Sequence, residues 1–213
     1  MEIQEKKAPS LSFPEFQNNE GWVMKRLGEV AKVKNGYAFK SNSYSKFGKY
    51  KIITISNVKS GYLDMTGNNY LTTIPQDIQP HQILKRGDIL ISMTGNVGRV
   101  CKVDCDDCLL NQRVGLIDIV SYEVDKDFIY TVLSSTAFEQ SMIFSGQGAA
   151  QANIGNKDIE GFCFFCPSSI DEQRKIASCF SSLNKMIKAC SDKAALLDLC
   201  KKGLMQQMFP TSK

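Results

Sequence analysis

The stretch Asp171–Phe209, DEQRKIASCFSSLNKMIKACSDKAALLDLCKKGLMQQMF, decides the architecture of this chain. It contains no proline, and Gly203 is its only glycine, so we expect one uninterrupted helix. Its apolar residues recur at alternating steps of four and three, which is the a/d spacing of a coiled coil. This seam consists of Ile176, Phe180, Leu183, Ile187, Cys190, Ala194, Leu197, Leu204 and Met208, with Lys201 at the one position that breaks the pattern.

A helix of this length is too long for one small domain to cover. Ser168–Ser169 precede the acidic residues Asp171 and Glu172, which favours a helix start, and Pro210 marks the end. At about 1.5 Å per residue the helix would be roughly 58 Å long. We therefore expect the seam to pair with a helix of a second chain. A helix that lies along its own domain is the alternative.

The rest of the 213-residue chain is sufficient for one ordinary domain. We predict an N-terminal arm over 1–21, a globular domain over 22–170, the helix over 171–209 and a tail over 210–213. No apolar run approaches the length of a membrane span, and the start MEIQEKKAPSLSF has no apolar centre of a secretory signal. Eight cysteines without such a signal predict reduced thiols and a cytoplasmic location.

The globular region alternates short strands with turns, which predicts an α+β fold. Helical spacing marks Trp22–Ala31 and Lys126–Phe144, the second with a break at Ser134–Ser135, while Ser145–Asn156 has the small polar residues of a loop. β-branched and apolar runs predict strands at Tyr50–Val58, Tyr70–Ile74, Ile89–Met93, Val97–Val103, Val114–Val120 and Ile159–Cys166. The expected architecture is a globular domain of mixed strands followed by one long C-terminal helix.

Charge is unevenly distributed along the chain. The formal net charge is only +4, but Trp22–Ser60 contains nine basic residues and one acid, a local excess of +8. By contrast, Asp104–Asp127 contains seven acids and two basic residues. A basic segment that also holds glycines and aromatic residues suits a polyanion such as DNA, although a solvated lysine-rich face has the same composition.

The familiar catalytic motifs are missing from the sequence. His81 is the only histidine, so no Ser/His/Asp or Cys/His arrangement can be built without it. There is no GxxxxGKS/T phosphate-binding loop and no GxGxxG motif. An enzyme that uses these motifs is therefore not supported.

The cysteines offer a second interpretation, a metal-dependent redox or S-adenosylmethionine enzyme. Cys101, Cys105 and Cys108 have the C-x3-C-x2-C spacing of some iron–sulfur sites, and Cys163 and Cys166 have the spacing of half a zinc site. Aspartates inside the first motif and the apolar surroundings of the second, FCFFC, argue against metal binding. We predict no metal site and keep the cysteine-ligated enzyme as the alternative.

Three polar segments have the composition of a surface that reads nucleic acid. Asn35–Ser41 combines a turn, aromatic rings and a cation, and Thr94–Arg99 allows close backbone approach. Asn111–Arg113 places amide and guanidinium groups side by side, which suit adenine, guanine or phosphate. We predict DNA contacts from Lys34, Tyr37, Lys40, Ser41, Lys46, Lys49, Thr94, Asn96, Arg99, Asn111, Gln112, Arg113 and Gln147, with the four lysines on phosphates.

The order of these motifs resembles that of specificity subunits of type I restriction–modification systems, in a form with a single target-recognition domain. The resemblance runs from about Pro9 to Phe209. It rests on Trp22 with Leu27–Val30, then Gly36–Ser41, Gly87–Gly95, Asn111–Arg113, Pro167 with Glu172–Ala177, and Leu204–Phe209. No single motif is diagnostic, but the ordered set is specific.

Members of that family usually carry two target-recognition domains, each followed by a long helix, and the two helices pair antiparallel. The resemblance therefore implies that this chain reads one half of a bipartite site in double-stranded DNA. It also implies that the C-terminal helix forms an antiparallel coiled coil with a second copy or with a related half subunit.

The same resemblance implies a chain without catalytic residues or cofactors of its own. A methyltransferase subunit that uses S-adenosylmethionine would bind to it, and a restriction subunit that uses ATP would be a further partner. The third interpretation, from a different class, is a coiled-coil interaction module that does not bind DNA. Salt-dependent binding to duplex DNA would distinguish this module from the specificity subunit.

Overall fold

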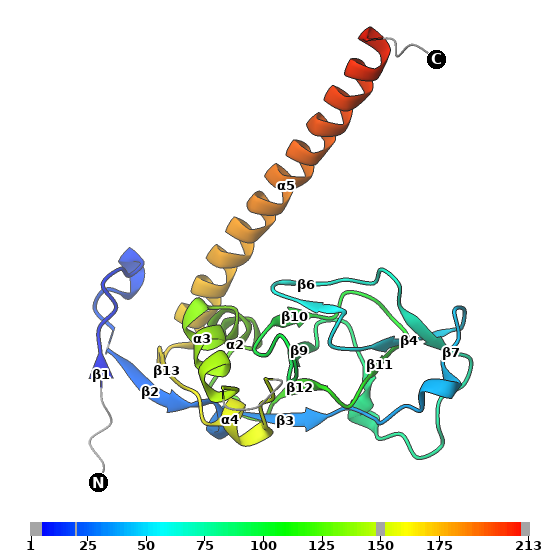
Figure 1. The fold of residues 1–213 in the computed structure, drawn as a ribbon. Helices are drawn as coiled ribbons and strands as arrows, with labels where there is room; N and C mark the ends of the chain where they lie inside the picture. Colours follow the sequence, from blue (N-terminus) through cyan, green and yellow to red (C-terminus); the bar gives the residue numbers. More distant parts are fainter. Residues whose placement is uncertain (1–5, 20, 148–151, 210–213) are drawn as a thin grey trace.

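Four antiparallel strands form the central sheet of the computed structural model, in the order β10-β9-β12-β3 (Figure 1). Their bounds are Val100–Lys102, Ile89–Ser92, Val114–Ile119 and Ala31–Asn35. Every residue of β9 is buried: Ile89 and Ile91 belong to one apolar cluster, and Leu90 belongs to another. Because both faces of this strand are covered, its first three residues are all apolar and do not alternate with polar residues.

The structure describes residues 6–19, 21–147 and 152–209. The predicted tail, 210–213, lies outside the described residues, as do parts of the predicted arm and of the predicted loop 145–156.

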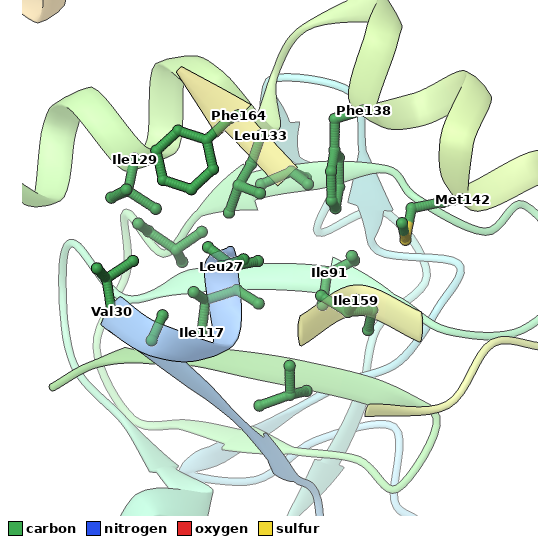
Figure 2. Close-up of a cluster of buried hydrophobic side chains, with 14 of the residues drawn as sticks. Leu27, Val30, Ile91, Ile117, Ile129, Leu133, Phe138, Met142, Ile159 and Phe164 are labelled. Carbon is green, nitrogen blue, oxygen red and sulfur yellow. The ribbon is translucent and has the colours of Figure 1, made fainter. Parts of the chain in front are cut away.

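Short helices and the edge strand β13 (Cys163–Cys166) contribute the apolar side chains that cover one face of the central sheet. Figure 2 shows Ile129, Leu133 and Phe138 from these helices facing Ile91 and Ile117 of the sheet. The helices are α1 (Leu27–Val30), α2 (Lys126–Leu133), α3 (Thr136–Ser145) and α4 (Asn156–Glu160). Burying each large apolar side chain is worth about 1.5–3 kcal/mol, so this cluster is the main stabilising core.

A second sheet of mixed direction, in the order β7-β4-β11-β8, extends the fold away from these helices (Figure 1). Its strands are Asn69–Leu71, Tyr50–Ile53, Cys108–Leu110 and Ile83–Leu84, and β11 runs parallel to β4. The hairpin of β5 (Val58–Lys59) and β6 (Tyr62–Leu63) contacts β10. Three single turns of 3-10 helix occur at Pro14–Phe16, Ser41–Ser43 and Pro80–Gln82.

A third sheet has the order β1-β2-β13 and corrects two predictions. The segment Trp22–Ala31, predicted as a helix, is the strand β2 (Trp22–Arg26) followed by the single turn α1, because β2 pairs with both β1 (Lys6–Lys7) and β13. Likewise, the predicted strand 159–166 contains the end of α4 at Ile159 and Glu160, and only Cys163–Cys166 is extended. Pairing between distant strands overrides local spacing in both places.

Turns also shorten three predicted strands. The predicted strand 50–58 is interrupted after β4, where the Asn57 side chain accepts hydrogen bonds from the Thr54 amide and hydroxyl at 2.8 Å each. The predicted strand 97–103 is β10 alone, since Gly98 has a φ of +81° in the preceding turn. The predicted strand 70–74 is limited to β7, 69–71.

The helical prediction for 126–144 is confirmed, including its interruption. Asp125 caps α2 by accepting from the amides of Asp127 and Phe128, and Ser135 caps α3 by accepting from the Phe138 amide. Two caps so close together end one helix and begin the next.

The long C-terminal helix α5 runs from Ile170 to Met208, against the predicted 171–209, and projects from the globular part (Figure 1). Its first turns pack on the globular part, where Ala177 is buried and Ile176 is half-buried. The predicted α+β class with a long C-terminal helix is confirmed.

No helix within the part of the chain that the structure describes is long and apolar enough to cross a membrane.

Candidate nucleic-acid interface

The topology of the central sheet brings three separate sequence segments together at one end of its strands. Both β3 and β9 run antiparallel to β12, with Asn35 paired to Gly115 and Ser92 paired to Val114. The ends of β3 and β9 therefore lie beside the start of β12. The predicted segments 35–41, 94–99 and 111–113 follow or precede these strand ends directly, so the fold gathers them.

A polar cleft of about 900 Å³ opens at this end of the strands. Three of the predicted DNA-contacting residues line it, Thr94, Gln112 and Arg113. The side chains of Gln112 and Arg113 are exposed, which leaves their amide and guanidinium groups accessible. Among the described residues, the lining is Asn35, Gly36, Met93, Thr94, Gln112, Arg113, Asn153, Ile154, Gly155 and Asn156.

The segment Asn153–Asn156 closes the cleft, although none of its residues was among the predicted contacts. The Ile154 amide donates to the Met93 carbonyl at 2.9 Å, and the Thr94 hydroxyl donates to the Asn153 side chain at 3.0 Å. The Asn156 side chain donates to the Val33 carbonyl at 3.0 Å. The polar composition of 145–156 predicted a loop, but only the tertiary structure shows which of its residues reach the cleft.

Two predicted residues use their polar groups in contacts with other residues of the same chain. Asn111 is 8% exposed, and its amide lies 3.5 Å from the Tyr44 hydroxyl and from the Arg113 amide nitrogen. The Tyr37 hydroxyl donates to Asp77 at 2.8 Å, and this hydrogen bond raises the pKa of the tyrosine above its usual range. Asn111 therefore supports the turn that presents Gln112 and Arg113.

The remaining predicted contacts lie outside the lining of the cleft. Ser41 begins a 3-10 turn and is exposed, as is Asn96, while Arg99 is half-buried. Gln147 is exposed just after α3, and residues 148–151 that follow it are outside the described part.

The four lysines predicted to contact phosphate differ in their ion pairing from three other lysines of the basic segment. Lys25, Lys32 and Lys59 form ion pairs with Glu123, Glu160 and Asp64. Among the described residues, no acidic side chain forms an ion pair with Lys34, Lys40, Lys46 or Lys49. Positive charge without an ion-pair partner in the described structure is therefore left at Lys34 of β3 and on the segment that connects β3 to β4.

The seam of α5 is largely exposed to solvent beyond the first turns. Phe180 and Leu183 are about half exposed, Ile187 is 66% exposed and Met208 is 70% exposed. The other seam residues after Ile176 are also exposed: Cys190, Ala194, Leu197 and Leu204. The prediction that the globular part cannot cover this helix is confirmed.

A buried polar joint, formed by Glu172 and Gln173, fixes the start of α5. Glu172 accepts from the Trp22 indole at 2.9 Å and from Asn19 at 3.1 Å. The Gln173 side chain donates to the carbonyls of Glu123 and Pro167 and accepts from the Asp125 amide at 2.7 Å. Glu172 and Gln173 are only 4% and 0% exposed. This buried joint therefore fixes the direction in which α5 leaves the globular part.

All eight cysteines are free thiols. Within the part of the chain that the structure describes, no group of three or more His, Cys, Asp or Glu side chains is placed to hold a metal ion. Burial raises the pKa of the Cys101 thiol to about 12 and that of the Cys166 thiol to about 11.

Residues 19–196 match the family model of the type I restriction modification DNA specificity domain. This match includes the cleft, the four lysines without an ion-pair partner, the joint and the first two thirds of α5. The chain belongs to this family.

Relatives with assigned names are specificity subunits. The chain is 26% identical over 196 residues to the type I restriction enzyme MjaVIII specificity subunit of Methanocaldococcus jannaschii, covering 89% of this chain and 46% of that protein. It is 30% identical over 199 residues to the EcoAI specificity subunit of Escherichia coli, covering 88% of this chain and 32% of that protein. The chain thus spans about half or less of the length of these relatives.

A solved structure shares the fold. The crystal structure of a type I restriction–modification system S subunit from M. genitalium superposes with a TM-score of 0.62 at 19% sequence identity. The superposition covers 92% of this chain and 46% of that one, so the shared fold includes the globular part and the long helix.

Proposed function

We propose that this chain is a DNA sequence-recognition subunit of a type I restriction–modification complex and reads one half of a bipartite site. One observation carries the proposal: three separate segments meet at one polar cleft, next to a chain segment whose lysines have no ion-pair partner in the described structure. Membership of a DNA specificity family supports the assignment of the ligand as double-stranded DNA.

Within this proposal, the cleft residues read bases and the lysines hold the backbone. Gln112 and Arg113 are exposed and have the amide and guanidinium geometry that pairs with adenine and guanine edges. Asn153 and Asn156 add further amides to the lining of the cleft. Lys34, Lys40, Lys46 and Lys49 contact phosphates, which fix the position of the protein but do not carry sequence information.

The seam of α5 pairs antiparallel with the same helix of a second copy or of a related half subunit. An antiparallel alignment centred near Asp192 places Ile187 opposite Leu197, Phe180 opposite Leu204 and Ile176 opposite Met208. Every apolar seam position except Leu183, which meets Lys201, then faces another apolar position. A rod of roughly 58 Å separates the two cleft edges by more than one turn of B-DNA.

The chain does no chemistry itself in this proposal. A methyltransferase subunit binds the specificity subunit and supplies S-adenosylmethionine for adenine methylation, and a restriction subunit supplies ATP-driven cleavage. The expected consequence is a cytoplasmic complex in which two half-sites in opposite orientation are separated by unread base pairs.

The decisive experiment is to map adenine methylation in a genome that expresses the methyltransferase subunit with or without this chain. We expect a single bipartite motif that appears only when the chain is present, and a symmetric motif if the chain pairs with itself. An asymmetric motif would identify a related half subunit as the partner. A chain that yields no motif, and whose binding to duplex DNA does not weaken with salt, would be an interaction module instead.

A further inference from the structure

Cys105 and Cys108 are in contact, and nothing in the proposed DNA-reading function uses them. Their sulfur atoms lie 2.9 Å apart at the turn between β10 and β11. Cys105 is half-buried and Cys108 is buried. This contact joins two thiols that are separated by only two residues, Asp106 and Asp107.

We propose that Cys105 and Cys108 form a reversible disulfide, with a low-molecular-weight disulfide as the co-reactant. A disulfide joins two sulfur atoms at about 2.05 Å, whereas two thiolates on one tetrahedral zinc ion, with bonds of about 2.3 Å, lie roughly 3.8 Å apart. The observed separation is too short for two ligands of one such ion. Among the described residues no third ligand completes a metal site around them.

Contacts from two other segments hold the turn in place before any bond forms. The Arg86 guanidinium binds the Asp106 carboxylate at 2.8 Å and also donates to the Asp104 carbonyl. Lys51 of β4 donates its backbone amide to the Asp107 carbonyl at 2.7 Å and its ammonium to the Asp106 carbonyl at 3.1 Å. Asp107 itself has a φ of +56°, a left-handed conformation that brings the flanking residues together.

The exchange begins at Cys105, because burial and the neighbouring sulfur raise the pKa of the Cys108 thiol and keep it protonated. The Cys105 thiolate attacks the small disulfide, forms a mixed disulfide and releases one small thiol. The Cys108 thiol then loses its proton to solvent and attacks the Cys105 sulfur, which releases the second small thiol. The protein is oxidised by two electrons and the small disulfide is reduced to two thiols.

The chain contains a matched pair that should not react in this way. Cys163 and Cys166 have the same C-x2-C spacing but lie in the strand β13, where residues three apart point to opposite faces. Their sulfur atoms contact different backbone oxygens, those of Gly161 and Pro167. In each pair the second thiol is buried and the first is more accessible, half-buried at Cys105 and exposed at Cys163, so geometry is the main difference.

The test is to incubate the whole chain in mixtures of oxidised and reduced glutathione, alkylate the remaining thiols, and digest with a protease that cleaves before aspartate. Cleavage at Asp106 and Asp107 separates the two cysteines unless a disulfide joins them. We expect one joined product without alkylation at either cysteine, fully reversed by excess reduced glutathione, while Cys163 and Cys166 are not joined. The variant C105S should lose the joined product and keep the native circular dichroism.

Three results would overturn the proposal. Cys105 could end as a stable mixed disulfide, it could join Cys101 and leave Cys108 free, or the chain could bind one zinc ion that C105S abolishes. A further variant tests the role of the preformed turn: R86Q should require a higher ratio of oxidised to reduced glutathione for half conversion. A ratio equal to that of the wild type would show that Arg86 does not prepare the turn.

Discussion

The globular part and α5 use the same apolar residue types in opposite environments. Ile89, Leu90 and Ile91 in β9 are completely buried, whereas Ile187 and Leu197 in α5 are 66% and 60% exposed. The globular part therefore folds around cores that it contains itself. The distal helix has intrahelical hydrogen bonds but, beyond its first turns, little tertiary packing, and packing supplies most of the stability of helices in proteins.

This contrast shows that the two parts depend on different partners. The globular part should remain folded as a single chain, whereas the exposed seam of α5 becomes stable only when a second helix covers it. The joint at Glu172 and Gln173 connects the buried globular part to the exposed helix. Its side chains are buried and hydrogen-bonded, although most of α5 is exposed.

The largest effect is expected from charge in the seam. In the double variant F180E/I187E, a dimer would bury carboxylates opposite Leu204 and Leu197, where it previously buried apolar side chains worth about 1.5–3 kcal/mol each. We expect dissociation to a monomer, a loss of affinity of about a thousandfold or more. Sedimentation equilibrium would measure the dimer dissociation constant. The urea midpoint for unfolding of the globular part should stay unchanged.

The matched control is L199E. Leu199 is 67% exposed on the same helix, but the helical repeat places it opposite the seam. We expect this variant to dimerise like the wild type. A double variant that still dimerises, or a control that dissociates equally, would show that another face of α5 makes the contact.

A smaller effect is expected at the joint. In Q173A the Asp125 amide and the carbonyls of Glu123 and Pro167 lose their hydrogen bonds to a buried side chain. A lost hydrogen bond costs about 0.5–1.5 kcal/mol and a buried unsatisfied group about 1–3 kcal/mol, so we expect a loss of roughly 3 kcal/mol in the free energy of unfolding. Urea titration monitored by Trp22 fluorescence reports on the same joint. Q206A, on the exposed part of α5, should leave the midpoint unchanged, and an equal loss in both would contradict a special role for the joint.

Sequence reasoning succeeded where local pattern and global fold agree. The heptad spacing of 176–208 predicted α5 because nothing tertiary opposes a helix that stands free. The helix break at Ser134–Ser135 followed from residues that cap helices. By contrast, Trp22–Ala31 has helical spacing, but its first half forms the strand β2, because the partner strands β1 and β13 come from the two ends of the globular part.

The sequence predicted which segments form the candidate site, but not which of their residues line the cleft. Turn-rich polar stretches marked 35–41, 94–99 and 111–113, and the antiparallel register of β3, β9 and β12 brings their starting points together. Burial then separates neighbours of similar chemistry: Asn111 is buried, whereas Gln112 is exposed. The contribution of Asn153 and Asn156 depends on how a distant loop packs on Met93 and Thr94, which no local pattern contains.

A third and smaller effect, on base preference, is expected from substitutions in the cleft of the globular part. Q112A or R113A should relax the preference for one base pair by about 1–3 kcal/mol, because a lost bidentate contact no longer discriminates between bases. Methylation mapping with each variant measures the change as a broadened position in the motif. Q147A is the control, since Gln147 is an exposed glutamine outside the cleft lining. A motif that changes with Q147A and not with Q112A would move base reading away from the cleft.

The smallest effect per residue is expected from the lysines that have no ion-pair partner in the described structure. Replacing Lys46 or Lys49 by alanine removes one phosphate contact, so binding should weaken alike for all DNA sequences. The slope of log K against log salt should fall by about 0.9 for each lost contact.

The control is K59A from the same basic segment, because Lys59 lies 3.9 Å from Asp64 and its charge is partly neutralised within the protein. If K59A lowers the slope as much as K46A does, ion pairing does not select the phosphate contacts, and the whole basic segment acts as a diffuse field. If the slope changes only with K46A and K49A, the chain segment between β3 and β4 follows the DNA backbone while the cleft reads the bases.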